Sequence, residues 1–540
     1  MAPGLLLAAL AAADFDLVIS NGRVVDGTGA PWFSADVGIK GDRITAVGDL
    51  KQRSATRRID VKGKMVAPGF IDLLGQSELY VLVDNRVESK IRQGITTEIS
   101  GEGVSVAPLD DRLIAEQRDW LAAKKLTIDW RDLDGYFRRF ERSKSAINLG
   151  LFIGAGNVRG VVLGLDDVQP TPEQLTQMEQ LVDTAMKQGA LGVSTALIYP
   201  HGSYAKTPEL VALAKVAARH GGLYATHLRG EDERFPSAFA EAVSIGREAG
   251  LPVEVWHLKV AEKKQWGRMK ELVALVDQAR KSGVDVSANV YPYTAAQNSL
   301  SASVPEWAQA GGVDAMIARF KDPAQRARIV KELTETGALA RETPEGILLV
   351  SFVNPALKPY AGMKLSEVAK AMKKPAAEAL LDLVEQDRGG TTAVRFWMSD
   401  DDVKLALAQP WASFCTDAPG QAIDGPFAGE KIHPRAFGGA ARLLGYWAKQ
   451  QGVFGLEEAV RHMTSLPARR MRLFDRGLIR PGMAADVTVF DPETIADTAT
   501  YEEPLRYATG VDTVIVNGRV VLDAGKLTAE RPGRALRRAK

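Results

Sequence analysis

Residues 222–259, GLYATHLRGEDERFPSAFAEAVSIGREAGLPVEVWHLK, contain two short apolar runs separated by a longer amphipathic stretch. The short runs suit strands, and the stretch at 235–250 has helical spacing and closes at a glycine. The first run turns polar at His227 and the second at His257. A strand, a helix and a second strand in this order predict a parallel β-α-β unit with both histidines at the same edge.

The same alternation extends from about residue 65 to residue 474. Further strand-like runs are INLGLFIGAG, ALGVSTALIY, VDVSANVYPY, GILLVSF and WASFCTDA, and helical stretches include TPEQLTQMEQLVDTAMKQG and MKELVALVDQARKSG. Repetition of this length predicts an α/β fold, a (β/α)8 barrel over 66–475, with its active site at the carboxyl ends of the strands. Extra helical patterns at about 301–390 predict an insertion over the barrel mouth.

Two distant segments resemble each other, VISNGRVVDG at 18–27 and VIVNGRVVLDAG at 514–525. In both, an Asn-Gly pair lies between apolar alternations, which is a strong signal for a tight hairpin. Short strands with glycine turns surround each segment. We therefore expect a small β-sandwich domain built from both ends of the chain, over 14–65 and 476–530.

The first residues, MAPGLLLAALAAADFD, include a short apolar run that ends in small residues. This pattern is typical of a signal-peptide core, although the basic start is missing, so 1–13 is interpreted as a truncated export signal. An ordinary apolar arm is the alternative. The interpretation favours a periplasmic or secreted protein and leaves a cytoplasmic one open.

The composition excludes several classes of function. The 68 Lys and Arg nearly balance the 67 Asp and Glu, so no basic field predicts nucleic-acid binding. No run of about 20 apolar residues predicts a membrane span. Cys415 is the single cysteine, so no intrachain disulfide forms. A small-molecule substrate is the expected partner, and a homo-oligomer is left open.

Few of the polar residues at strand ends suit catalysis. A lone histidine there is usually structural, but His227 and His257 on successive strands favour a metal or catalytic role. Asp417 ends the run WASFCTDA, where it is either a turn cap or a general base. Arg435 follows an irregular loop and is either a surface residue or a fork that binds a carboxylate.

These features together resemble the amidohydrolase superfamily, in the branch of the D-aminoacylases. The resemblance spans nearly the whole chain from residue 14. The matching segments are THLRGE at 226–231, WHLK at 256–259, NVYPYTA at 289–295, the Asp of CTDA, HPR at 433–435 and SLPARRMRLFDRGLIRPGMAADVTVFDP at 465–492.

Three departures from the family pattern concern its metal and substrate positions. The family has a His-x-His pair after GFID, where this chain has Leu74 and Gln76. In SGEGVSVAP, Glu102 stands where the family has a metal-binding cysteine, and Gln297 replaces a later serine. The resemblance then implies one zinc ion, held by Glu102, His227 and His257, because only one ligand set is complete. The alternative is that Glu102 is a turn residue.

The resemblance also implies an activity, hydrolysis of the amide bond of N-acyl amino acids or small peptides. Zinc would activate a water, and Asp417 would accept its proton and pass it to the leaving amine. Lys259, Tyr291 and Arg435 match positions that hold the substrate carboxylate, and Gln76 and Gln297 are further expected substrate contacts. Two alternatives are a metal-free relative that binds acyl amino acids without turnover, and an amidohydrolase acting on a cyclic amide.

Overall fold

The computed structural model describes residues 13–538. Apart from Ala13, the predicted export signal at 1–13 lies outside the described residues, so it stays a prediction. Within 13–538, no helix combines the length and the apolar character that a membrane span requires.

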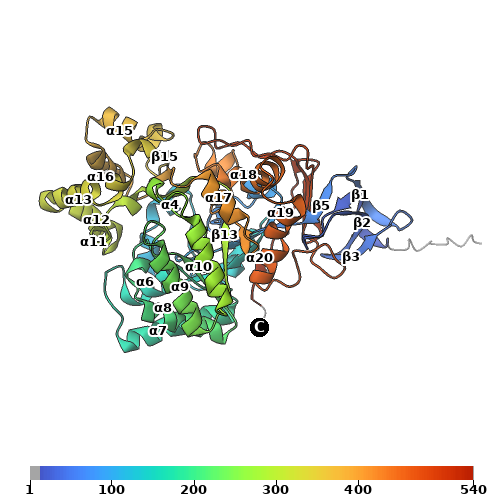
Figure 1. Ribbon diagram of the computed structural model, residues 1–540, viewed down its shortest axis with the longest axis horizontal. Helices are drawn as coiled ribbons and strands as arrows, with labels where there is room; N and C mark the ends of the chain where they lie inside the picture. The colour runs from blue at the N-terminus through green and yellow to red at the C-terminus, as the bar shows by residue number, and fades with distance from the viewer. Residues whose placement is uncertain (1–12, 539–540) are drawn as a thin grey trace, which may run out of the picture.

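Both ends of the chain contribute to one nine-stranded sheet. Its central link is the antiparallel pairing of β5 with β18, in which Pro68 lies opposite Val487. Its strands are β1 (Phe15–Val24), β2 (Phe33–Lys40), β3 (Arg43–Gly48), β4 (Ala55–Asp60), β5 (Met65–Pro68), β18 (Val487–Phe490), β19 (Val511–Val516), β20 (Arg519–Asp523) and β21 (Lys526–Leu527). Figure 1 shows its β1, β2 and β3 at one end of the molecule. The predicted division into two packed sheets stays a prediction.

The two Asn-Gly pairs behave differently. Asn517 and Gly518, both with positive φ, form the turn between β19 and β20, as predicted. Asn21 and Gly22 lie inside β1, where the register with β2 shifts, so the hairpin predicted there is wrong. A Cβ on Gly22 would come within 2.5 Å of Val66 Cγ2, which shows that this glycine serves close packing inside the strand.

Parallel strands occupy the centre of the molecule in two sheets. One has the order β22-β8-β7-β6, and the other β17-β13-β12-β11-β10-β9. Their bounds are β6 (Phe70–Asp72), β7 (Ile95–Ser100), β8 (Asn148–Leu151), β9 (Ile153–Gly154), β10 (Gly192–Ala196), β11 (Leu223–His227), β12 (Val253–Val255), β13 (Val286–Val290), β17 (Ala412–Phe414) and β22 (Ala535–Leu536).

The two parallel sheets are joined at both ends. Only Phe152 separates β8 from β9. At the other side, β6 lies beside β17, because the Leu73 N–H donates to the Phe414 carbonyl at 3.2 Å and the Asp417 N–H to the Leu74 carbonyl at 2.8 Å. The carboxyl ends of all these strands therefore face one common region.

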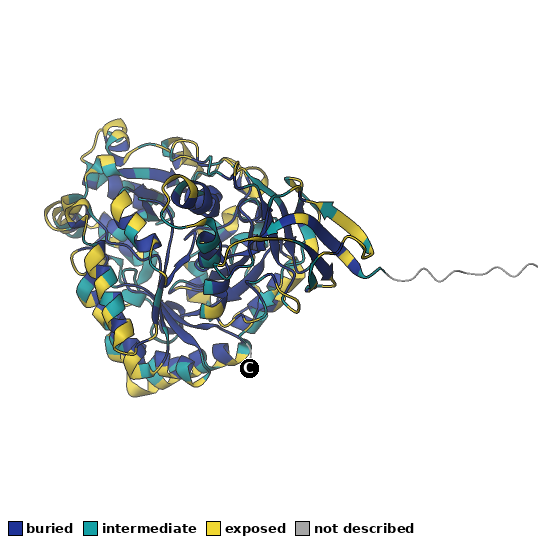
Figure 2. Ribbon diagram, turned by 45° about the vertical axis from the view of Figure 1, so that its right-hand side comes forward, coloured by how far each residue is buried: buried dark blue, intermediate teal, exposed yellow. Residues whose placement is uncertain are grey.

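Amphipathic helices cover the parallel strands. The helices between or before the strands are α7 (Pro172–Gln188), α8 (Thr207–Arg219), α9 (Phe235–Ala249), α10 (Met269–Lys281) and α17 (Asp400–Leu407). α7 begins with a capping box between Thr171 and Gln174 and ends at Gly189. In Figure 2 the helices of this layer are exposed outward and buried toward the strands.

Further helices complete this body. They are α1 (Tyr80–Val83), α2 (Glu88–Ile91), α3 (Asp111–Ala115), α4 (Arg118–Ala123), α5 (Leu133–Ser143), α6 (Ala155–Leu163), α18 (Arg435–Arg442), α19 (Leu456–Met463) and α20 (Ser465–Arg470).

The segment at 296–395, which contains the insertion predicted at about 301–390 and extends beyond it at both ends, has its own sheet and core. The strands β14 (Ala296–Ser299), β15 (Ile347–Ser351) and β16 (Thr392–Arg395) form an antiparallel sheet in the order β14-β16-β15. Its helices are α11 (Glu306–Gln309), α12 (Gly312–Lys321), α13 (Pro323–Glu335), α14 (Ala338–Arg341), α15 (Leu365–Met372) and α16 (Ala376–Gln386). The run at 346–352, predicted as one more parallel strand, is instead β15. Figure 1 shows α11–α16 at the end of the molecule opposite β1.

Candidate active site

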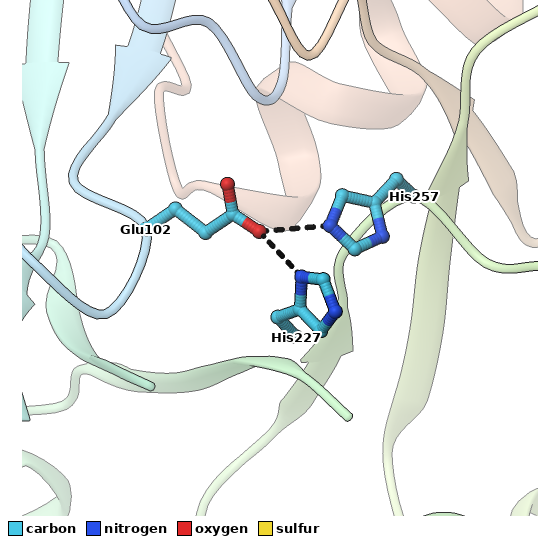
Figure 3. A group of neighbouring side chains, drawn as sticks. All are labelled: Glu102, His227 and His257. Atoms are coloured by element: carbon cyan, nitrogen blue, oxygen red, sulfur yellow. Dashed lines mark hydrogen bonds and ion pairs between the residues drawn. The ribbon is translucent and has the colours of Figure 1, made fainter. Parts of the chain in front are cut away.

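Three side chains from different strand ends converge on one point. His227 is the last residue of β11, His257 follows β12, and Glu102 lies in the turn after β7. Glu102 Oε1 is 3.0 Å from His227 Nδ1 and 2.8 Å from His257 Nε2 (Figure 3). Two imidazoles and one carboxylate that converge in this way form a ligand set suited to a divalent metal.

Glycines on either side of Glu102 fix its position. Gly101 and Gly103 both have positive φ. A Cβ on Gly101 would lie 2.6 Å from the Phe152 carbonyl, and one on Gly103 would lie 2.2 Å from the Ala196 nitrogen. Only glycine permits this close approach, so the turn directs Glu102 toward the histidines.

The electrostatics of the group also suit a cation. Burial alone would raise the pKa of Glu102, but the charge of His257 and hydrogen bonds from both histidines hold that pKa well below its usual range. Burial and Lys259 lower the pKa of His257, yet the charges of Glu102 and Asp417 outweigh them and raise it to about 9. The ligand set thus stabilises positive charge between its members.

Asp417 follows β17 in a conformation that is rare for a residue with a side chain, with φ +49°. The carboxylate accepts a hydrogen bond from Gln76 Nε2 at 2.9 Å and forms an ion pair with Arg435 Nη2 at 2.8 Å. Burial raises the pKa of Asp417 above its usual value, although Arg435 and His257 oppose the rise. The result is a fixed carboxylate of increased basicity beside the candidate metal ligands.

His257 shares this backbone strain, with φ +35°. The backbone N–H of His257 donates to Asn289 Oδ1 at 2.6 Å, and the backbone N–H of Asp417 likewise donates to the Leu74 carbonyl. Strained residues persist where the surrounding structure fixes them, and such positions concentrate at functional sites.

Leu74 and Gln76 occupy the two positions at which the family pattern has its His-x-His pair. Leu74 is fully buried in the main hydrophobic core. Gln76 Nε2 donates to Asp417 Oδ1 and lies 3.4 Å from Glu102 Oε2. The neutral amide of Gln76 therefore links Glu102 to Asp417.

Arg435 and Tyr291 present unused donors beside this centre. Among residues 13–538, Arg435 Nε and Nη1 and the Tyr291 hydroxyl are buried without a hydrogen-bond partner. The guanidinium carbon of Arg435 lies 4.5 Å from the Tyr291 ring centroid. Burial raises the pKa of Tyr291 well above its usual value, so its hydroxyl stays a donor. These converging donors suit a carboxylate.

Lys259 has a second role that the sequence did not indicate. Its Nζ lies 2.7 Å from Glu231 Oε1 and 2.6 Å from His257 Nδ1, and 5.7 Å from the Tyr291 ring centroid. Lys259 therefore contacts the ring nitrogen of His257 that does not face Glu102, and it also lies near Tyr291.

Glu231 is the residue that sequence reasoning missed. Its carboxylate also lies 3.4 Å from His227 Nε2 and 3.3 Å from His257 Nδ1. Burial would raise the pKa of Glu231, but the charges of His227 and Lys259 lower it well below its usual value. The sequence feature that could have indicated Glu231 is its position four residues after His227, at the end of the segment THLRGE. Glu231 lies beside the ring nitrogens that do not face Glu102, the position from which carboxylates commonly orient metal-binding histidines.

Gln297 lies apart from this group. On β14, its Oε1 accepts from the His433 N–H at 2.7 Å and its Nε2 lies 3.4 Å from Thr392 Oγ1. His433 Nδ1 in turn accepts from the Arg435 N–H at 3.0 Å. The described contacts of Gln297 thus connect the inserted sheet to the start of α18, and a substrate contact stays a prediction.

Comparison with known proteins agrees with this geometry. A family model described as "Amidohydrolase family" matches residues 57–522. The chain belongs to the amidohydrolase family, in the branch of the D-aminoacylases.

Its relatives match over almost their whole lengths. D-aminoacylase from Alcaligenes xylosoxydans xylosoxydans is 34% identical, over 97% of this chain and 98% of the relative. A solved N-acyl-D-glutamate deacylase from Bordetella bronchiseptica, complexed with zinc and a phosphonate mimic of the tetrahedral intermediate, is 31% identical, with TM-score 0.82 over 97% of this chain and 99% of the other.

A second solved relative is a D-aminoacylase with a binuclear metal centre, for which activation by one metal and attenuation by a second metal are described. It is 34% identical, with TM-score 0.80 over 97% of this chain and all of the other.

Proposed function

We propose that this protein is a metal-dependent deacylase of N-acyl amino acids. One observation carries the proposal: the convergent set of Glu102, His227 and His257 lies next to a fixed carboxylate, Asp417, which Arg435 touches. The activities of the deacylase relatives support it. We also infer that the joined parallel strands form the closed (β/α)8 barrel of this family.

We infer that one zinc ion binds per chain. Glu102 keeps the negative charge of the cysteine that it replaces in the family pattern, whereas Leu74 offers no ligand. The one-metal activation named for the D-aminoacylase relative supports a single working metal. Bound there, the metal would act as a Lewis acid toward the substrate carbonyl and would lower the pKa of a water.

The residues of the chain supply the remaining chemistry. Arg435 and Tyr291 bind the α-carboxylate of the substrate through their unused donors, with Lys259 nearby. Asp417 accepts the proton of the attacking water and delivers it to the leaving amine nitrogen. Gln76 keeps the Asp417 carboxylate directed toward the ligands.

Turnover of a matched panel tests this function. Zinc-loaded protein is assayed with N-acetyl-D-amino acids, their L-enantiomers and the methyl esters of both. We expect release of acetate from free acids of one enantiomeric series and much slower release from the esters. Lack of hydrolysis of every member, with one zinc bound, would refute the proposal. Lack of both zinc and turnover would favour the metal-free binding protein.

A further inference from the structure

A large apolar cavity of about 480 Å³ opens beside Gln76. The loop after β6, the α3–α4 segment and α12 of the insertion form its walls. Apolar residues that line it include Leu79, Val106, Leu113, Trp120, Val313 and Met316. Its volume lies within the range of about 300–1,000 Å³ typical of ligand pockets, far more than an acetyl group fills.

We propose that this cavity binds the acyl chain of the substrate, and that the enzyme acts on amino acids carrying a medium- or long-chain aliphatic acyl group. This inference rests on the proposed deacylase function. It adds the substrate class, which the catalytic residues alone leave open.

The position of the cavity selects the acyl chain over the amino-acid side chain. Gln76 lines the cavity and contacts Glu102 and Asp417, between which the scissile amide is to react. The carboxylate donors Arg435 and Tyr291 are not among the cavity-lining residues. In an N-acyl amino acid, the side chain and the carboxylate branch from the same carbon, whereas the acyl chain leaves from the other side of the amide.

A second, smaller cavity is available for the side chain. It measures about 170 Å³ and adjoins Glu231, the partner of Lys259 at the carboxylate end. Its walls carry charged residues, among them Arg341, Glu342 and Arg395. The two cavities thus differ in polarity, and the larger one is the more suitable for an apolar tail.

The polar groups of the large cavity favour an uncharged occupant. Burial raises the pKa of Glu78 to about 8 and lowers that of His201 to about 4, so both are neutral near pH 7. Arg388 is paired with Asp119, and Glu116 accepts from the Val313 N–H at 3.0 Å. The charged side chains of this wall are therefore few, and they lie among predominantly apolar residues.

A series of acyl lengths tests the proposal. The kcat/KM of the zinc-loaded enzyme is measured with N-acetyl, N-butyryl, N-hexanoyl, N-octanoyl and N-decanoyl derivatives of one amino acid. We expect kcat/KM to rise by about fourfold per added methylene until the cavity is filled. A flat or falling series, with the acetyl compound still hydrolysed, overturns the acyl assignment but leaves the proposed function intact. No turnover of any member defeats the proposed function itself.

Val313→Trp fills the cavity from α12 and provides the matching variant. We expect it to lower kcat/KM for the decanoyl substrate at least tenfold and to change the acetyl value less than twofold. Val330→Trp, on α13 of the same insertion and also half-buried, is the control that should leave both values unchanged. If Val313→Trp does not fold, Ile114→Trp blocks the same cavity from α3.

Binding without turnover gives an independent measurement. Calorimetry should show that decanoate binds the wild-type protein, and that Val313→Trp weakens it at least tenfold relative to Val330→Trp. Equal binding by both variants overturns the proposal. A rise in kcat/KM with the length of the amino-acid side chain, and none with the acyl chain, assigns the cavity to the side chain instead.

Discussion

Replacement of Glu102 by glutamine should empty the metal site. The Glu102 Oε1 atom is the single oxygen that both imidazoles face, at 2.8 and 3.0 Å, so the change removes the only anion of the ligand set. Zinc sites with four protein ligands bind with about 10–16 kcal/mol, which is about 3 kcal/mol per ligand and more than a hundredfold in Kd. We therefore expect the zinc Kd of Glu102→Gln to rise at least about 100-fold.

The assay is a zinc titration against a chelating dye, with metal content measured after dialysis. Asp417→Asn is the matched control, because it makes the same carboxylate-to-amide change within the same hydrogen-bonded network. It should retain zinc while turnover falls by about 10²–10⁴-fold. Glu102→Cys restores an anionic ligand and should retain zinc and some activity. If Glu102→Gln kept zinc and rate while Asp417→Asn lost zinc, the assigned roles would be reversed and the reasoning refuted.

Three further predictions address other residues of the site. Arg435→Ala should lower kcat/KM on N-acyl amino acids by about 2–4 kcal/mol of lost transition-state binding, and much less on their methyl esters; equal losses would remove its carboxylate role. Asn289→Ala leaves the backbone N–H of His257 unpaired and should raise the zinc Kd about 10–100-fold, measured by dye titration. An unchanged Kd would show that Asn289 does not position His257 for zinc binding. The raised pKa of Glu78, about 8, means that the folded state holds a proton that the unfolded state releases, so stability is present below about pH 4.5 and lost as pH rises through 8. The free energy of unfolding of Glu78→Gln, measured with denaturant, should therefore be about 2–4 kcal/mol higher than that of the wild type at pH 9 but not at pH 5. Parallel dependence of the two free energies on pH would contradict this prediction.

Periodicity and strand ends made much of the site predictable. His227, His257 and Asp417 each follow an apolar run, and parallel strands bring such ends together. Glu231 escaped because it lies in an irregular loop, where its orientation toward the histidines depends on tertiary packing. Its neighbours in sequence carry no pattern that separates it from a solvated acidic turn.

Identical local sequence also failed to decide local structure. The Asn-Gly pair at 517–518 turns the chain between two strands, whereas the pair at 21–22 continues through β1. The difference comes from the neighbours, because β1 pairs with β2, β4 and β5 and is held extended by all three. The run at 346–352 has the composition of a buried strand in either sheet, and only its antiparallel partner β16 settles its direction.

The pairing of β5 with β18 affects how the protein is made. Pro68 leaves the ribosome long before Val487, its partner in the sheet, and at about 5–20 residues per second the wait is roughly 20–80 s. Throughout that time β5 lacks its partner, and an unpaired strand edge is a template for pairing with other nascent chains. Biosynthesis of this enzyme therefore depends on shielding that edge for longer than in a protein whose sheet is assembled from consecutive strands.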